Sequence, residues 1–180
     1  MGPIRMMEVF DMAALAHLGV GLAAKQVAPT VPAGILVAGA YAIDIVWGGF
    51  FLAGIEKFPA PGIDSTAPWS HGLFMSVVWS ALAAGIAALV TRNRRTALVI
   101  GLLVFSHWVI DFIAKPMTFS MPYDKGVPLL FRGSPTIGLG LWRYQLGEYI
   151  GEYGTLAFGA VMYILTLIKL KKAKAQPAMN

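Results

Sequence analysis

Two ionisable side chains lie one helical turn apart in an apolar stretch of this chain. The segment FSHWVIDFI, residues 105–113, carries His107 and, four residues later, Asp111. Positions i and i+4 of a helix lie on the same face, so both side chains would project together. Such a pair can supply two ligands to a metal ion, or the carboxylate can fix the tautomer of a liganding imidazole. A buried hydrogen-bonded pair that joins two helices is the structural alternative.

Further ionisable side chains lie in other apolar segments of the chain. They are His17, Asp44, His71, Glu148 and Glu152. An ionisable group inside a membrane costs about 2.5–3.5 kcal/mol on insertion scales, and such groups usually serve a function. We therefore expect these side chains to face the interior of a helix bundle or a water-filled cavity.

The apolar segments are long enough to cross a membrane. The chain of 180 residues is 57% hydrophobic and only 13% charged, whereas about a quarter of the residues of soluble domains are charged. A spanning helix needs about 20 apolar residues. Five segments qualify, at about 8–25, 33–55, 69–91, 96–114 and 144–168. The sequence predicts an all-α integral membrane protein, a bundle of about five transmembrane helices.

Basic residues divide unequally between the two sides of this bundle. With an odd number of spans, one side carries only basic charges: Lys25, Arg92, Arg94, Arg95, Lys169, Lys171, Lys172 and Lys174. Cytoplasmic segments are enriched in Lys and Arg, so we expect the N-terminus outside and the C-terminus in the cytoplasm. Residues 1–168 would form one transmembrane domain with a long outer loop at about 115–143. A basic cytoplasmic tail follows at 169–180. Because the net charge of +5 comes from the ends of spans, we expect a membrane partner and no nucleic acid.

This topology brings the ionisable side chains to a similar depth. Counted from the outer end of each span at about 1.5 Å per residue, they fall in the outer half of the bilayer or near its middle. Two ligands from His107 and Asp111 would be joined by His17, His71 and Asp44. Three imidazoles with carboxylates suit zinc, with iron or manganese as alternatives, and the chain has no cysteine. A metal-bound water has a lowered pKa, and Glu152 or the remaining aspartate, Asp44, would act as general base.

Several motifs of the chain resemble a family of bacterial integral membrane metal-dependent hydrolases. They are HLGVGLAAKQVAP at 17–29, AIDIVWGGFFLAGIE at 42–56, PWSHGLFMSVVW at 68–79, LVFSHWVIDFI at 103–113 and GLGLW at 138–142. The resemblance covers about residues 15–165 and implies a bacterial inner-membrane location. Residue by residue, it implies the metal ligands His17, Asp44, His71, His107 and Asp111. The wider group often has two histidines where this chain has one, in WSHG, and this departure from the pattern favours a mononuclear site over a multinuclear one.

Three functions are compatible with these residues. The leading hypothesis is a membrane-embedded metal-dependent hydrolase that acts on a lipid or other amphiphile from the outer side. The second is a proton- or ion-coupled transporter or channel subunit, because chains of Asp, Glu and His also serve as proton relays. The third is a membrane protein that binds a metal or haem without catalysis. Gly- and Ala-rich helix faces would also permit a homo-oligomer.

Overall fold

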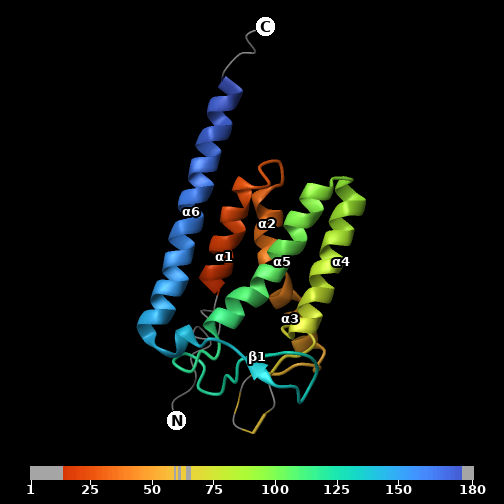
Figure 1. Ribbon diagram of the computed structural model, residues 1–180, viewed down its shortest axis with the longest axis vertical. Helices are drawn as coiled ribbons and strands as arrows, with labels where there is room; N and C mark the ends of the chain where they lie inside the picture. The colour runs from red at the N-terminus through yellow and green to blue at the C-terminus, as the bar shows by residue number, and fades with distance from the viewer. Residues whose placement is uncertain (1–13, 59, 61, 64–65, 176–180) are drawn as a thin grey trace.

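The described part of the chain is all-α except for one short hairpin. The computed structural model describes residues 14–175, apart from 59, 61, 64 and 65. The elements are α1 (Ala14–Ala23), η1 (Ala24–Gln26), α2 (Ala33–Ala40), α3 (Ala42–Leu52), α4 (Leu73–Thr91), α5 (Arg94–Ala114), β1 (Val127–Pro128), β2 (Thr136–Ile137), η2 (Leu141–Arg143) and α6 (Gln145–Ala175). Figure 1 shows the long helices side by side, with the hairpin and the longer connections gathered at one end of the bundle.

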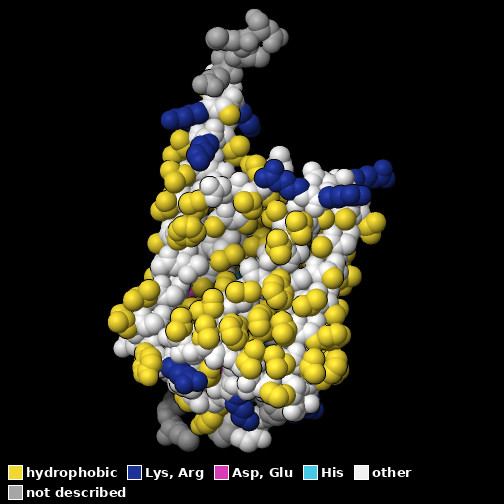
Figure 2. All heavy atoms as spheres, in the orientation of Figure 1, with side chains coloured by type: hydrophobic (Ala, Val, Ile, Leu, Met, Phe, Trp, Pro, Cys, Tyr) yellow, Lys and Arg dark blue, Asp and Glu magenta, His cyan; other side chains and the backbone are white. Residues whose placement is uncertain are grey.

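Three helices are long and apolar enough to cross a membrane, namely α4, α5 and α6. Helices α2 and α3 pass the same test only together, as a pair bent by 58° at their junction. Helix α1 has 10 residues, and residues 8–13 of the predicted first span lie outside the described part of the chain. The all-α character is confirmed, and three of the predicted segments form helices long and apolar enough to span, while the count of five spans and the orientation of the termini stay predictions. Hydrophobic side chains cover the band between the two basic ends of the molecule (Figure 2).

Helix α5 is the central helix of the bundle. Its buried residues recur every three or four positions, which is the spacing of one helix face: Ala97, Ile100, Gly101, Leu103, Val104, His107, Asp111 and Ala114. The helix begins at a cap in which the Asn93 side chain accepts a hydrogen bond from the Thr96 N–H at 3.1 Å, as capping residues do. One face of α5 therefore carries both apolar core residues and the ionisable pair.

Helices α1 and α6 approach each other at glycines. A Cβ atom built on Gly19 would collide with the backbone of Thr155, and one on Gly159 would collide with the backbone of Gly19. Small residues at such positions let two helices pack with their backbones nearly in contact. This packing fixes α1, which carries His17, against α6, the longest helix among the described residues.

Two boundaries differ from the prediction. Helix α4 begins at Leu73, so His71 lies in the turn before the helix rather than within the predicted span at 69–91. Helix α6 continues to Ala175, because the Lys, Ala and Leu residues after position 168 are strong helix formers. The predicted basic tail at 169–180 is thus helical as far as the described residues reach.

Candidate metal centre

The three histidines and two of the aspartates come together on the face of α5. His107 and Asp111 belong to α5, His17 to α1 and Asp44 to the first turn of α3, while His71 precedes α4. The site lies between two apolar clusters, one containing Ile100 and Leu103 and the other Ala114. His17 and His107 are each 1% exposed and Asp111 is 2% exposed. Ionisable side chains buried to this extent need partners of opposite charge or a bound ion.

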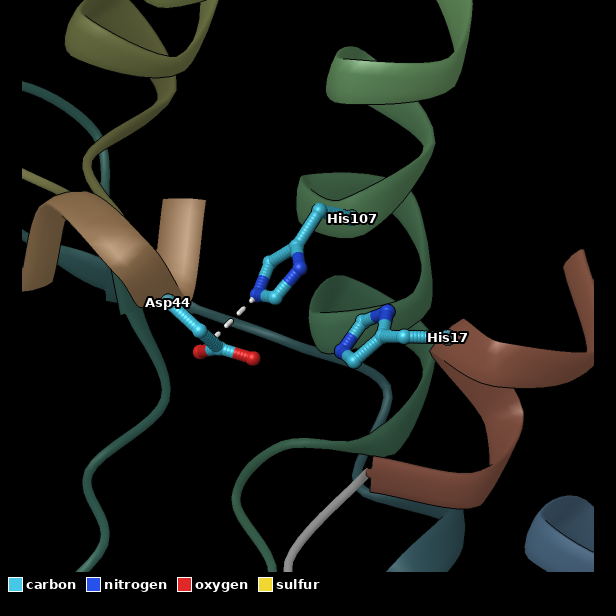
Figure 3. A group of neighbouring side chains, drawn as sticks. All are labelled: His17, Asp44 and His107. Carbon is cyan, nitrogen blue, oxygen red and sulfur yellow. Dashed lines mark ion pairs between the residues drawn. The ribbon is translucent and has the colours of Figure 1, made fainter. Parts of the chain in front are cut away.

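The Nε2 atoms of the three histidines lie near the carboxylates of Asp44 and Asp111. The Nε2 atoms of His71 and His107 lie 3.3 Å and 3.4 Å from the same Asp44 oxygen, Oδ1. The Nε2 atom of His17 lies 3.7 Å from Asp111 Oδ1, and that of His71 lies 3.8 Å from Asp111 Oδ2. Figure 3 shows the His107 and Asp44 side chains facing each other, with the His17 ring beside them.

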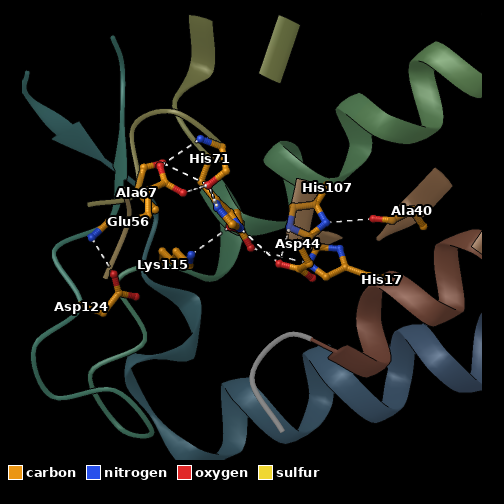
Figure 4. A network of polar contacts seen from close by, with 12 residues as sticks. His17, Ala40, Asp44, Glu56, Ala67, His71, His107, Lys115 and Asp124 are labelled. Atoms are coloured by element: carbon orange, nitrogen blue, oxygen red, sulfur yellow. Dashed lines mark hydrogen bonds and ion pairs between the residues drawn. The ribbon is translucent and has the colours of Figure 1, made fainter. Parts of the chain in front are cut away.

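The bend between α2 and α3 fixes the orientation of the His107 ring. Ala40, the last residue of α2, offers its carbonyl oxygen to His107 Nδ1 at 2.9 Å, as Figure 4 shows. A carbonyl oxygen can only accept a hydrogen bond, so Nδ1 of His107 carries the proton. The opposite nitrogen, Nε2, is left facing Asp44.

A buried carboxylate, Glu56, orients the His71 ring through a serine. The Ser70 hydroxyl donates to Glu56 Oε2 at 2.6 Å and lies 2.8 Å from His71 Nδ1. The hydroxyl has one proton and donates it in the hydrogen bond to the Glu56 carboxylate. Nδ1 of His71 must therefore be the donor in its hydrogen bond to the Ser70 oxygen. Glu56 Oε1 also accepts the backbone N–H groups of Trp69 and Ser70, at 2.8 Å and 3.1 Å. This arrangement resembles the outer-shell partners that orient metal-liganding histidines.

These hydrogen bonds decide what the inner nitrogens can do. With Nδ1 protonated, a neutral imidazole presents the lone pair of Nε2, and two such lone pairs would face Asp44 Oδ1. Lone pairs at this distance from a carboxylate oxygen repel it unless a cation lies between them. The cation is either a proton on Nε2 or a metal ion. Lys115, the charged neighbour of the cluster, does not fill this role because it contacts Asp111 instead, at 3.0 Å from Oδ2.

The spacing of the ligand atoms suits one metal ion. Two groups satisfy the distances for a shared ion, with all ligand atoms of a group within 4.8 Å of one another: His17, Asp44 and His107, and His71, His107 and Asp111. Two ligands of a tetrahedral ion with bonds of about 2.0–2.1 Å lie about 3.3–3.4 Å apart, which matches the distances to Asp44. Both groups include His107. Its Nδ1 atom is hydrogen-bonded to the Ala40 carbonyl, so only Nε2 is free to bind a metal, and the two groups describe a single centre.

Lys115 closes the cluster toward the long loop. Burial disfavours its charged form, but the Asp111 carboxylate outweighs this and, with help from Asp124, raises the pKa of Lys115 above its ordinary value. Asp124 itself accepts the backbone N–H groups of Met117 and Gly126, at 2.8 Å and 2.9 Å. The ammonium group thus compensates one carboxylate of the cluster and leaves the other, Asp44, for a second cation.

The two glutamates of α6 lie outside both ligand groups. Glu152 accepts the backbone N–H of Ala16 at 2.8 Å, in the first turn of α1, where helices leave N–H groups without intrahelical partners. Its described contact therefore holds the start of the helix that carries His17. Glu148 lies in the first turn of α6. Glu56 and Ser70 were not predicted as site residues, because Glu56 lies in a polar connection that gives no periodic signal.

Comparisons with known proteins add no family to this geometry. A scan against protein-family models finds no match, and neither the curated proteins nor the solved structures yield one. The resemblance to membrane hydrolases stays a prediction, and the geometry of the His/Asp cluster is the basis for a function.

Proposed function

We propose that this chain is an integral membrane protein whose His/Asp cluster binds one divalent metal ion and hydrolyses a lipid or other amphiphile. One observation carries the metal proposal. The Nε2 atoms of His71 and His107 converge on Asp44 Oδ1, while their Nδ1 atoms are engaged by Ser70 and Ala40. Imidazole and carboxylate ligands without thiolates suit zinc first, then iron or manganese.

The uneven exposure of the ligands supports catalysis over a closed structural site. The Asp44 side chain is 40% exposed, against 9% for His71 and 1% for His107. A structural zinc site is closed by protein ligands, whereas a catalytic one keeps an open position, at which the pKa of a water falls to about 7. Asp44 is the ligand that a substrate can reach. We therefore propose that its carboxylate accepts the proton from the attacking water. We assign Glu152 to positioning α1.

The finer topology belongs to the same proposal. We infer five crossings, of which the α1 crossing is short and the α2–α3 crossing is broken at its bend. The end of α1, the α4–α5 turn and the end of α6 lie at one end of the bundle (Figure 1). That end carries the uniformly basic set from Lys25 to Lys174, which supports a cytoplasmic C-terminus and an external hairpin. The centre would then open on the outer side of a bacterial inner membrane.

The stacked rings of His17 and His107 argue against a haem held between these two histidines. Their centroids are 3.7 Å apart and their planes differ by 6°. Axial haem ligands approach the iron from opposite faces of the macrocycle, and two rings in direct stacking leave no space for a porphyrin between them. A proton relay remains the competing function, because protons on Nε2 would satisfy the same contacts.

The hydrolase proposal is tested by metal-dependent turnover. The protein is purified in detergent, stripped with a chelator and reloaded with Zn²⁺, Mn²⁺ or Fe²⁺. It is then assayed on long-chain phosphoesters, esters and amides and on their short soluble analogues. We expect metal-restored hydrolysis of the long-chain substrates that Asp44→Asn abolishes. Lys125→Met removes an exposed charge of the outer loop, outside both ligand groups, and should keep the activity. Bound metal without turnover of any substrate would overturn the hydrolase and leave a metal-binding protein.

A further inference from the structure

The hairpin of the long loop is docked on the first turn of α4. Strands β1 and β2 pair antiparallel, with Val127 opposite Ile137, and the loop between them reaches the start of α4. There the Phe74 N–H donates to the Leu129 carbonyl at 3.1 Å, which satisfies one of the free N–H groups of a helix N-terminus. A Cβ atom on Gly72 would lie 2.8 Å from the Leu130 oxygen. The hairpin is thus held at a fixed height on α4.

This docking gathers four exposed apolar side chains into one patch. We call Trp69, Phe74, Leu130 and Phe131 the outer patch; they are 38%, 47%, 52% and 42% exposed. The Phe131 ring lies between the other two rings, with centroid distances of 5.2 Å to Trp69 and 5.5 Å to Phe74. Contiguous apolar surface of this kind marks contact with a partner or a membrane.

The outer patch continues the apolar face of α4. Exposed side chains follow that face along the helix, at the spacing of a helix: Phe74, Val77, Val78, Leu82, Ile86 and Leu89. Helix α4 has 19 residues and is about 28 Å long at 1.5 Å per residue. The helix is therefore long enough to cross a hydrocarbon core of about 30 Å from one boundary to the other. Phe74 then lies at the boundary of the hydrocarbon, and Phe131, whose ring meets it edge to face, lies at the same depth.

We propose that the outer patch is a membrane anchor, buried at the boundary between lipid headgroups and acyl chains. Tryptophan is enriched at that boundary because its ring is amphipathic. Arg132, exposed beside Phe131, is placed to reach lipid phosphates as long basic side chains do at membrane surfaces. The anchor has a consequence for the site. Trp69 stands two residues before His71, so the anchor holds the His/Asp cluster near the headgroup level, where a lipid could enter it.

Site-directed spin labelling tests the anchor directly. The chain has no cysteine, so Leu130→Cys creates a single labelling site in the full-length protein. Lys125→Cys is the matched control, because Lys125 is exposed just before β1, in the same loop and outside the outer patch. Both proteins are labelled with a nitroxide and reconstituted into vesicles of phosphatidylethanolamine and phosphatidylglycerol. Collision with oxygen, which partitions into lipid, is compared with collision with a water-soluble nickel chelate.

The anchor predicts that the label at 130 meets oxygen more often than nickel, and that the label at 125 shows the reverse. Equal nickel access at both positions would overturn the proposal, since the patch would then lie in water. Spin–spin broadening at 130 that disappears on dilution with unlabelled protein would also overturn it, because a second copy would cover the patch. Neither result depends on whether the cluster binds a metal.

Discussion

The imidazole rings of His17 and His107 lie face to face, with centroids 3.7 Å apart and 6° between their planes. The contact joins α1 to α5 inside the bundle. Two positively charged rings at this distance inside the protein would repel each other strongly, so at most one of the pair is protonated. Lys115 compensates one of the two aspartates. With the three imidazoles neutral, one negative charge is left on Asp44, and it needs a cation, which is either a proton on an imidazole or a metal ion.

The Ser70 hydroxyl should matter to metal affinity although it is not a ligand. Ser70→Ala removes the acceptor of the His71 Nδ1 proton and cuts the contact between Glu56 and His71. Loss of an outer-shell partner of a liganding histidine weakens metal binding about 10- to 100-fold. Competition with a fluorescent zinc chelator measures the effect.

Ser76→Ala is the control for this variant. Ser76 is as buried as Ser70, but its hydroxyl has no hydrogen-bond partner among the described residues. We expect wild-type zinc affinity in Ser76→Ala. Equal losses in both variants would show that any buried serine change disturbs the fold, and would refute the relay from Glu56.

Removing the Lys115 ammonium should destabilise the protein. Lys115→Met leaves the buried Asp111 carboxylate without its cation, and breaking a buried ion pair in this way costs about 3–5 kcal/mol. Because the pKa of Lys115 is raised above 10.5, its contribution is complete at neutral pH. It is lost only as the pH rises through the higher pKa of the folded state. Unfolding in mixed micelles with increasing SDS measures the difference.

Lys125→Met removes a similar charge from an exposed position of the same loop. Its free energy of unfolding should stay within about 0.5 kcal/mol of wild type. A Lys115→Met protein as stable as Lys125→Met would mean that another group neutralises Asp111, and the charge balance of the cluster would need revision.

The glycine contact between α1 and α6 should be intolerant of a methyl group. In Gly159→Ala the new Cβ meets the backbone of Gly19, and overpacking of this kind costs about 1–3 kcal/mol. The displaced α1 carries His17, so zinc affinity should fall as well. In Gly85→Ala the new Cβ meets nothing within 4 Å, so thermal stability should equal or slightly exceed that of wild type, because Ala favours the helix, and zinc affinity should match wild type. A Gly159→Ala protein indistinguishable from Gly85→Ala would contradict the close packing.

The sequence was informative about the cluster because burying charge is costly. His107 and Asp111 share a helix face by their spacing, and Asp44 in an apolar helix demanded a partner. The structure brings these residues together with His17 and His71. The predicted spans were too regular, since His71 lies in a turn before α4 and Asp44 just after a bend, and the depth of the cluster in a membrane stays a prediction.

Other features could not be predicted from periodicity. The junction at Ala40 and Tyr41 has no proline, yet the bend there delivers the carbonyl that orients His107. Glu56 begins a connection rich in Pro, and Ser70 lies at the start of the predicted span at 69–91, and neither residue belongs to a helix or strand pattern. Their role arises only when the chain folds back to place the loop beside α4. Long-range packing of this kind leaves no local trace in the sequence.

Metal stoichiometry tests the central claim most directly. Protein purified in detergent is analysed by elemental mass spectrometry, as wild type, as His107→Ala and as the control Ser76→Ala. The two proposed ligand groups share His107, so this one substitution should empty the centre. We predict about one equivalent of zinc, iron or manganese in wild type and in Ser76→Ala, and none in His107→Ala. No bound metal in the wild type, even after reconstitution with each ion, would contradict the metal centre and leave the proton relay as the explanation of the cluster.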